Sequence, residues 1–512
     1  MSALGSYLLA NLVSVLVALV VVTIAFWKWK YQYWKRRNVP YLEPGIPFGN
    51  MEDVIRGKKF VGITLKGLYK EMRSRGWKHG GIYTFTKPSY VPLDLDYVRN
   101  IMTKDFKTFM DRDIYVNEKD PLQAHLLNLS GTRWRNMRAK LTPTFTSGKM
   151  KAMFQVMAES QKGLQKKMDE EYKRNQAINI KEILACFTTN IIGSCAFGLD
   201  CQALEDEDSA FRVFGRKIFT VSKLQTFKRL FAVTFPQLAK LLNLSLTRKE
   251  QSNFITNMVQ DTIEYREKNN YTRNDFMQLL INLKNNKSQD FEGHDGKPLS
   301  LDEVASQALV FFVAGFETSS TLMTFALYEL ARHEDIQEKL RREINSVLEQ
   351  HNGQMTYDSI QDMKYLSQVI DETLRMHPPA TQTNRKCLED YKIPGQDVII
   401  EKGTTVIIPI MGIHYDEEYY PEPEKFDPER FTDENKKLRH NFAHLPFGEG
   451  PRNCIGMRFG LLQSKMGLVS LLKNYNFTVN KKTIEPLQYK PNHFVLAAQG
   501  DIWLNAEKIE NI

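Results

Sequence analysis

The first 27 residues contain no Asp, Glu, Lys or Arg, and this feature restricts the fold more than any other. Residues 7–27 read YLLANLVSVLVALVVVTIAFW, with clear polar interruptions only at Asn11, Ser14 and Thr23. As a helix, this run covers about 30 Å, which is the thickness of the hydrocarbon core of a bilayer. A cleaved signal peptide is the alternative, but the run is long for one and no basic segment precedes it. The sequence therefore predicts a membrane anchor at residues 1–27.

Basic and aromatic residues follow this run directly, within residues 28–37. Such a mixture is typical of the cytoplasmic end of a membrane span, so we expect the body to lie in the cytosol. Five of the nine net positive charges lie here, so attraction to anionic headgroups explains them better than nucleic-acid binding, and we expect no nucleic-acid partner. Three prolines and two glycines occur within residues 39–50, which predicts a stiff, non-helical connector. We therefore interpret residues 28–50 as a basic and Pro/Gly-rich linker.

Residues 51–512 show no internal repeat and are interpreted as one catalytic domain, mainly α with small β-sheets. Strand-like pieces occur at 82–86, 397–400 and 405–410, and a hairpin that turns at Gly500 and Asp501 is expected near the end. Residues 282–298 are polar and predict a surface loop, whereas the Phe-rich stretch 211–244 suits either core packing or an aromatic lid that touches the membrane. The five cysteines are irregularly spaced and include no CxxC, which indicates a reducing compartment and neither a disulfide framework nor a zinc ribbon.

A long helix is predicted from Ser300 to about residue 333, because S-x-x-E forms a capping box and apolar residues then recur at helical spacing. Gly315 lies in its interior, where glycine costs about 1 kcal/mol relative to alanine. Gly315 and Thr318 share a helix face, so the glycine could admit a ligand to the backbone beside a hydroxyl. A tight helix crossing is the other reading. Glu317 adjoins Thr318, so we expect a carboxylate and an alcohol at one point.

Two weaker patterns also place polar groups together. Glu372 and Arg375 are three residues apart on a predicted helix, and Arg430 of FDPERF could complete a network with them. Trp134 and Arg138 are four apart and face the same way, so an indole N–H and a guanidinium could donate to one carboxylate. Taken alone, each pattern is more often an ordinary structural or surface pair.

The most specific motif is PFGEGPRNCIG, residues 446–456, which cannot form a regular helix or strand and carries a lone thiol. A helix pattern follows it directly, so a thiolate there would be stabilised by the helix dipole and by free backbone N–H groups. Its spacing F-x-x-G-x-R-x-C-x-G is fulfilled, with one further glycine inside, by Phe447, Gly448, Gly450, Arg452, Cys454 and Gly456.

These motifs together resemble the cytochrome P450 family. WRNMR, AGFET, ETLR, PERF and the cysteine motif occur in that family's order, and the similarity spans roughly residues 40–505. LTPTFTSGKMK at 141–151 and CAFGLD at 195–200 are most similar to insect microsomal members that metabolise xenobiotics. The resemblance implies the P450 fold, in which haem lies between a long oxygen-binding helix and the loop that carries the cysteine ligand.

The resemblance also implies a role for each matching residue. Cys454 is the expected axial ligand of the haem iron, and Thr318 with Glu317 is the expected acid–alcohol pair that delivers protons. Glu372, Arg375 and Arg430 are expected to form a structural salt-bridge network. The other expected haem contacts are Arg112, Trp134, Arg138, Ala314, Gly315, Arg385, Phe447, Gly448, Arg452 and Gly456. The expected substrate contacts are Ile114, Phe312, Phe316, Ala380 and Thr381.

The activity that the resemblance implies is a monooxygenase reaction on small lipophilic compounds, either xenobiotics such as plant toxins or insecticides, or endogenous lipids. Haem b, O2 and NADPH would serve it, with electrons from NADPH–cytochrome P450 reductase and cytochrome b5 as a further candidate partner. Arg458 and Lys465 are expected to meet the reductase, and the protein is expected on the cytosolic face of the endoplasmic reticulum membrane. Two alternatives stay open: a P450-fold isomerase or dehydratase that needs no external electrons, and a non-enzymatic haem-thiolate protein that binds ligands.

Overall fold

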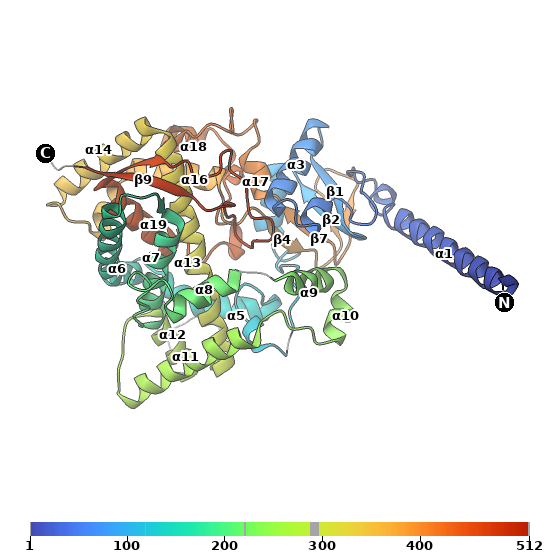
Figure 1. Ribbon diagram of the computed structural model, residues 1–512, viewed down its shortest axis with the longest axis horizontal. Coiled ribbons are helices and arrows are strands. Elements are labelled where there is room, and N and C mark those ends of the chain that lie inside the picture. Colours follow the sequence, from blue (N-terminus) through green and yellow to red (C-terminus); the bar gives the residue numbers. More distant parts are fainter. Residues whose placement is uncertain (1, 118, 220–221, 287–295, 510–512) are drawn as a thin grey trace.

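The computed structural model describes residues 2–117, 119–219, 222–286 and 296–509 (Figure 1). Helices fill one side of the body, and most of the β-structure of the N-terminal region lies on the other side, from which α1 projects. The α-helices are α1 (Ser2–Lys30), α2 (Glu52–Ile55), α3 (Val61–Ser74), α4 (Leu95–Arg99), α5 (Gly131–Leu141), α6 (Ser147–Lys173), α7 (Ile180–Ile192), α8 (Ala210–Phe219), α9 (Lys223–Thr234), α10 (Pro236–Leu241), α11 (Lys249–Lys268), α12 (Phe276–Lys284), α13 (Leu301–Arg332), α14 (Glu334–Gln350), α15 (Tyr357–Asp362), α16 (Lys364–Met376), α17 (Ile410–His414), α18 (Asp433–Lys437) and α19 (Met457–Leu472).

The described strands form three sheets. In the first, β2 pairs with β7 in parallel and the other pairs are antiparallel. The strands of this sheet, in spatial order, are β1 (His79–Thr84), β2 (Lys87–Pro92), β7 (Thr405–Ile408) and β4 (Thr383–Lys386). The second sheet holds β3 (Ile178–Asn179), β9 (Trp503–Lys508) and β8 (Tyr475–Val479), and the third holds β5 (Tyr391–Lys392) and β6 (Ile399–Ile400).

The hairpin expected at Gly500 and Asp501 is wrong. The chain does turn there, with φ of 81° and 61° at the two residues. However, β9 after the turn pairs with β8 and β3, whereas the residues before the turn form only an isolated bridge between Tyr489 and Ala498. Strand β9 pairs with β8, the strand that follows α19. The residues around the turn do not indicate this pairing, because the two strands are distant in the sequence.

Helix α1 extends away from the body and leaves its apolar side chains uncovered (Figure 1). The hydroxyls of Ser14 and Thr23 donate to the carbonyls of Ala10 and Leu19 at 2.9 and 2.6 Å, so these polar groups are satisfied within the helix, as a hydrocarbon environment requires. Among the described residues, the helical segment Ile180–Phe197, which is α7 with the turn that follows it, and α13 are also long and apolar enough to cross a membrane, but they are largely buried in the body. Of these three helices, the N-terminal one is therefore free to cross a membrane.

The segment predicted as a linker packs on the body. Helix α1 continues to Lys30, and the residues that follow it join the core around the first sheet. Trp34 is fully buried where Gly81 lacks a side chain, since a Cβ at Gly81 would lie 2.3 Å from the indole. Its Nε1–H donates to the carbonyl of Ile82 at 3.3 Å. This aromatic residue belongs to the core because the sheet offers it an apolar surface.

Helix α13 passes through the centre of the helical side and contacts α7, α11, α16, α19 and β8. Its predicted capping box is confirmed: the Ser300 hydroxyl accepts from the Glu303 N–H at 3.1 Å, and the Glu303 carboxylate accepts from the Ser300 N–H at 3.0 Å. A Cβ at Gly315 would lie 2.5 Å from the Cδ1 atom of Ile192 in α7. The missing side chain of Gly315 thus permits a close crossing of α13 and α7, which is one of the two readings.

The Phe-rich stretch divides into two parts. Phe214 and Phe219 in α8 are buried in the core, whereas Phe227 in α9 and Phe235 at the start of α10 are 63% and 54% exposed. Core packing and an outward aromatic surface thus both occur, on different helices. The polar stretch after α12 lies partly outside the described residues, from 287 to 295.

Candidate active site

A cavity of about 630 Å³ gathers residues that are far apart in the sequence. They come from α5, from α13, from β4 and the segment before it, and from the loop that precedes α19. Every residue for which a haem contact was expected lines this cavity: Arg112, Trp134, Arg138, Ala314, Gly315, Arg385, Phe447, Gly448, Arg452, Cys454 and Gly456.

The Cys454 loop is held in an irregular conformation by its glycines. Gly450 has φ of 72°, and a Cβ there would lie 2.0 Å from the Met102 carbonyl oxygen, so no other residue is accommodated without a shift. The Cys454 N–H donates to the Phe447 carbonyl at 2.9 Å. Helix α19 begins three residues after Cys454, whose side chain is open to the cavity although it lies inside the protein.

The ionisation of Cys454 depends on opposing effects. Burial raises the pKa of its thiol, while the Gly456 N–H, Arg138 and Arg112 act in the opposite direction. Arg138 also fixes the loop, because its guanidinium donates to the carbonyl and to the side-chain oxygen of Asn453 at 2.8 Å each. Burial disfavours the thiolate, so a cation at the sulfur, such as a metal ion, would complete this site.

Two buried arginines, Arg385 and Arg452, and the half-buried Arg112 line the cavity without a full set of anionic partners. Burial lowers the pKa of Arg112 to about 10 and, together with repulsion from Arg112, lowers that of Arg385 to about 9. The pKa of Arg452 is likewise lowered to about 9 by burial and by Arg112 and Arg385, despite Asp111 at 3.6 Å. Within the described chain, Arg385 Nε and Arg452 Nη1 are buried without a hydrogen-bond partner. An anionic ligand in the cavity would satisfy both atoms.

The α13 wall of the cavity follows helical spacing from Thr318. The Thr318 hydroxyl donates to the Ala314 carbonyl at 2.7 Å, and Ala314, Phe311 and Val310 follow on the same face. The expected contacts Ile114, Ala380 and Thr381 also line the cavity.

The expected substrate contacts at Phe312 and Phe316 require correction. Both side chains are fully buried and pack toward α8, where Phe312 meets Phe214 and Phe316 meets Phe219. Successive side chains of a helix are rotated by about 100° around its axis, so only one stripe of them can face the cavity. Phe312 and Phe316 lie outside that stripe. Sequence reasoning missed Phe311 instead, although counting back seven residues from Thr318 would have found it.

Glu317 does not share the cavity with Thr318. It is buried on another side of α13, where its carboxylate lies 3.0 Å from the ammonium of Lys181 in α7. The acid and the alcohol are neighbours in the sequence but face different hollows, again because of the helical rotation. The expectation of both groups at one point is therefore wrong.

The expected salt-bridge network is present and lies outside the cavity lining. Arg375 donates to both carboxylate oxygens of Glu372, at 2.6 and 2.9 Å, and both side chains are fully buried. Arg430 lies 3.5 Å from the same carboxylate. The prediction that Lys465 meets the reductase is wrong, because Lys465 is buried and donates to the Ser367 hydroxyl at 2.8 Å. Arg458, the other residue predicted there, is exposed.

A cysteine loop, cationic side chains and a threonine-bearing helix around one cavity define the site, and comparison with known proteins identifies it. The family model described as Cytochrome P450 matches residues 55–504. The chain belongs to the cytochrome P450 family. It is 43% identical over 489 residues to "Probable cytochrome P450 6a14" of Drosophila melanogaster, covering 94% of this chain and 96% of that protein. It is also 42% identical over 504 residues to "Cytochrome P450 6a2" of the same organism, covering 97% and 99%.

As a P450, the chain is a monooxygenase that uses haem iron and O2, and members of this family generally take electrons from a redox-partner reductase. Its residues fit a haem group. Cys454 supplies a soft ligand for iron, and Arg385 and Arg452 supply unsatisfied donors for the haem carboxylates. Gly456 faces open space, since the nearest atom to a Cβ there would be 3.9 Å away, in Phe145. The N-terminal helix is compatible with a membrane anchor, and the family suggests a microsomal membrane protein.

Proposed function

We propose that this P450 inserts one oxygen atom from O2 into small lipophilic compounds of the xenobiotic type, with haem b as its cofactor and NADPH as the source of electrons. The overall change is RH + O2 + two electrons + two protons to ROH + H2O. The observation that carries the proposal is a single cavity with an open thiol, unsatisfied arginine donors and largely apolar walls. Apolar walls of this kind favour ligands without charge.

When bound, the haem iron with a thiolate ligand supplies O2 binding and O–O cleavage. Cys454 provides that ligand, and its loop holds the sulfur through the Phe447 carbonyl and the Arg138–Asn453 hydrogen bonds. Arg385 and Arg452 would bind the two carboxylates of the haem and so orient it between α13 and the loop.

Thr318 supplies the hydroxyl on the opposite wall. In the structure this hydroxyl donates its proton to the Ala314 carbonyl, so it is held in one orientation and its oxygen can accept another proton donor from the cavity side. We assign to Thr318 the role of holding a proton donor close to the reacting centre. The apolar side chains of Val310 and Phe311 on the same helix face exclude bulk water around it.

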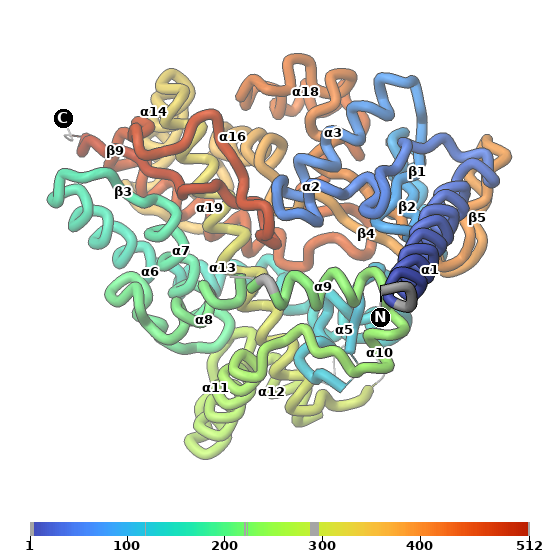
Figure 2. The backbone as a smooth tube through the Cα atoms, turned by 45° about the vertical axis from the view of Figure 1, so that its right-hand side comes forward, coloured from blue at the N-terminus to red at the C-terminus, as the bar shows by residue number. Residues whose placement is uncertain are grey.

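We also assign a membrane location and electron partner. The apolar α1, followed by basic residues, supports anchoring in the endoplasmic reticulum with the body on the cytosolic face. Helices α9 and α10 lie on the side of the body from which α1 leaves (Figure 2), and they expose Leu224, Phe227 and Leu241, so lipid contact there is proposed too. NADPH–cytochrome P450 reductase, with cytochrome b5 as an accessory donor, would deliver electrons near the exposed Arg458.

The test is a CO difference spectrum of the reduced protein, followed by NADPH oxidation with reductase and a panel of lipophilic compounds. The wild type is expected to show the thiolate-type Soret band, and Cys454→Ser is expected to lose it completely. Cys387→Ser is the matched control, since Cys387 is buried outside the cavity lining and its thiol already donates to the Glu389 carbonyl. Retention of the band by Cys454→Ser, or product formation that needs no NADPH, would contradict the proposal.

A further inference from the structure

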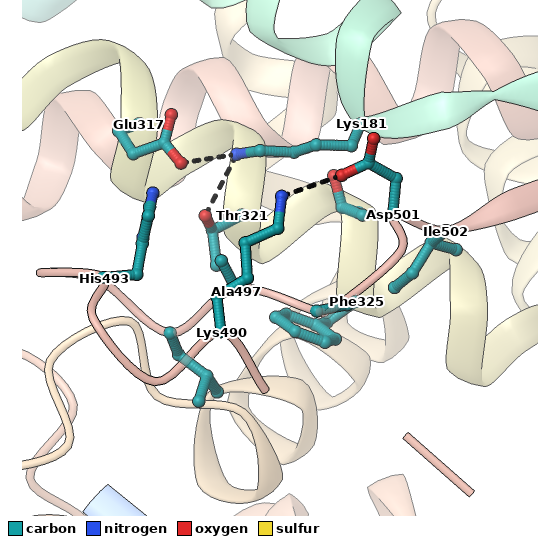
Figure 3. A pocket seen from close by; sticks show the side chains of 12 residues that line it. Lys181, Glu317, Thr321, Phe325, Lys490, His493, Ala497, Asp501 and Ile502 are labelled. Carbon is teal, nitrogen blue, oxygen red and sulfur yellow. Dashed lines mark hydrogen bonds and ion pairs between the residues drawn. The ribbon is translucent and has the colours of Figure 1, made fainter. Parts of the chain in front are cut away.

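Two hollows adjoin α13, and the acid and the alcohol lie in different ones. Thr318 lines the large cavity, whereas Glu317 lines a second pocket of about 50 Å³. Lys181, Thr321, Lys490 and Asp501 also line this second pocket (Figure 3). A proton relay that uses both Glu317 and Thr318 therefore needs a group between the two hollows.

The pocket at Glu317 is suited to water. Its volume of about 50 Å³ exceeds the ~10–15 Å³ that one water molecule needs, and its walls carry several hydrogen-bonding groups. The Lys181 ammonium lies 3.0 Å from the Glu317 carboxylate and donates to the hydroxyls of Ser320 and Thr321 at 2.8 and 3.1 Å. Lys490 and Asp501 form a second ion pair at 3.0 Å. These groups can order water and exchange protons with it.

Among the described residues, His493 is the one that lines both hollows. Its ring is stacked on Phe219 of α8, with the ring centres 5.6 Å apart, and Figure 3 shows it beside Glu317. The Nδ1 atom lies 2.7 Å from the Val495 carbonyl oxygen, which can only accept, so Nδ1 carries the hydrogen. In the neutral ring, Nε2 is then a free acceptor for a proton.

We propose that His493 carries protons from the water pocket of Glu317 to the cavity of Thr318. A proton leaves an acid or a hydronium ion in the pocket and binds to Nε2, which forms an imidazolium. The new N–H bond then breaks when the proton passes to a water or hydroxyl on the cavity side, and the neutral ring returns. No electrons move in this exchange. The Nδ1 hydrogen stays hydrogen-bonded to the Val495 carbonyl, so Nε2 must both receive the proton from the pocket and release it to the cavity. A small rotation of the ring between these two steps would turn Nε2 from one side to the other.

Burial of the ring keeps His493 in the accepting state. Burial lowers the pKa of His493, and Lys181 and Lys490 act in the same direction, whereas Glu317 opposes them. The ring is therefore neutral near neutral pH and becomes protonated only as the pH falls. This inference rests on the role proposed for Thr318, and it assigns to His493 a positioning role in proton delivery, without contact with the reacting atoms.

The first experiment compares His493→Phe and His493→Gln with the wild type in the reconstituted holoenzyme. His493→Phe keeps the aromatic stack on Phe219 but carries no proton, and His493→Gln keeps hydrogen bonding without titration. Both are expected to form about tenfold less product per NADPH than the wild type, with the electrons diverted to peroxide or water. The wild-type product yield is expected to depend on pH below about pH 6.5, where the ring with its lowered pKa begins to bind a proton, and both variants should lose that dependence. His440→Gln is the control, since His440 lines neither hollow and pairs with Asp96.

The second experiment does not depend on turnover. In histidine-labelled holoenzyme with CO bound, the ring nitrogen signal that is absent from His493→Gln identifies His493, and its shift with pH gives its pKa. Glu317→Gln is expected to lower that pKa, because the carboxylate favours the charged ring. An unchanged titration in Glu317→Gln, or unchanged product yield in both His493 variants, overturns the inference. If the wild type itself oxidises no substrate with NADPH and reductase, the proposed function fails, while the titration still reports on His493.

Discussion

Two groups of buried arginines in this protein differ in what neutralises them. Arg375 is fully buried, and the carboxylate of Glu372 accepts two hydrogen bonds from it. Arg385 and Arg452 are almost equally buried, yet no carboxylate holds either in this way, and each has a nitrogen without a partner in the described chain. The same residue type in the same degree of burial therefore serves two purposes. Arg375 is neutralised by a carboxylate of the protein itself, whereas Arg385 and Arg452 would be neutralised by a ligand.

The physical reason is the cost of a buried charge. An isolated ion in a protein interior is strongly unfavourable, and a hydrogen-bonded counter-ion offsets that cost. Around Glu372, the Asp427 N–H and Arg430 add to the pairing. Around Arg385, the acceptors that the protein offers are the neutral Thr383 hydroxyl and the Asn384 carbonyl. Binding of the haem carboxylates would thus offset the cost of burying the charge of Arg385 and so stabilise the folded protein.

The largest expected effect comes from breaking the self-completed group. Glu372→Ala leaves Arg375 buried without its counter-ion, so the free energy of unfolding should fall by about 3–5 kcal/mol, in apoprotein and holoprotein alike. Urea unfolding followed by circular dichroism measures this change. Glu429→Ala is the control, because Glu429 pairs with Lys339 near the surface and should cost less than about 1 kcal/mol. Equal effects of the two substitutions would show that burial does not distinguish these pairs.

The second prediction concerns the group that awaits a ligand. Arg385→Met removes a charge that lacks a carboxylate, so the apoprotein should keep its stability or gain a little, while haem should dissociate about tenfold faster, the equivalent of a charged hydrogen bond. The measurements are urea unfolding of the apoprotein and the rate of haem transfer to an excess of an apoglobin. Arg385→Lys keeps a charge and should give an intermediate rate. A clear loss of apoprotein stability with an unchanged haem transfer rate would contradict the difference between the two groups.

The smallest expected effect concerns His125, a histidine near Arg112. Burial, followed by Arg112, lowers the pKa of His125 to about 4, with Asp120 acting in the opposite direction. In the unfolded chain the pKa is ~6.5, so between these values the unfolded state binds more protons than the folded state. The contribution of His125 to the stability of the apoprotein is therefore fully present above pH 6.5, and it is lost as the pH falls toward 4.

Replacing this group should flatten that decline. His125→Gln is expected to remove roughly 1 kcal/mol of the difference in unfolding free energy between pH 6.5 and 5.5. Haem binding should also reduce the pH dependence that His125 causes in the wild type. The reason is that a haem carboxylate near Arg112 would offset the positive charge around the histidine. Urea midpoints at the two pH values, with and without haem, measure both changes. If the unfolding free energies of His125→Gln and the wild type depend on pH in the same way, the prediction for His125 is wrong.

Sequence reasoning succeeded where neighbours in the chain determine the structure. The capping box at Ser300 and the irregular cysteine loop before α19 both depend on residues a few positions apart. It failed where a side chain could face either of two sides. Phe312 and Phe316 were expected in the cavity and pack toward α8, and Glu317 was expected beside Thr318 and pairs with Lys181. The helical period was correctly predicted, but the identity of the element that packs on each face was not.

By itself the sequence determined the N-terminal apolar helix, the position of the thiol and the pairing of Glu372 with Arg375, because each follows from side chains within one or a few helical turns. Only the tertiary structure decided that Trp34 belongs to the core and that Glu317 and Thr318 line different pockets. These outcomes depend on surfaces contributed by residues distant in the chain. Burial, and with it the strength of every charge and hydrogen bond at the site, arises only when those distant surfaces meet.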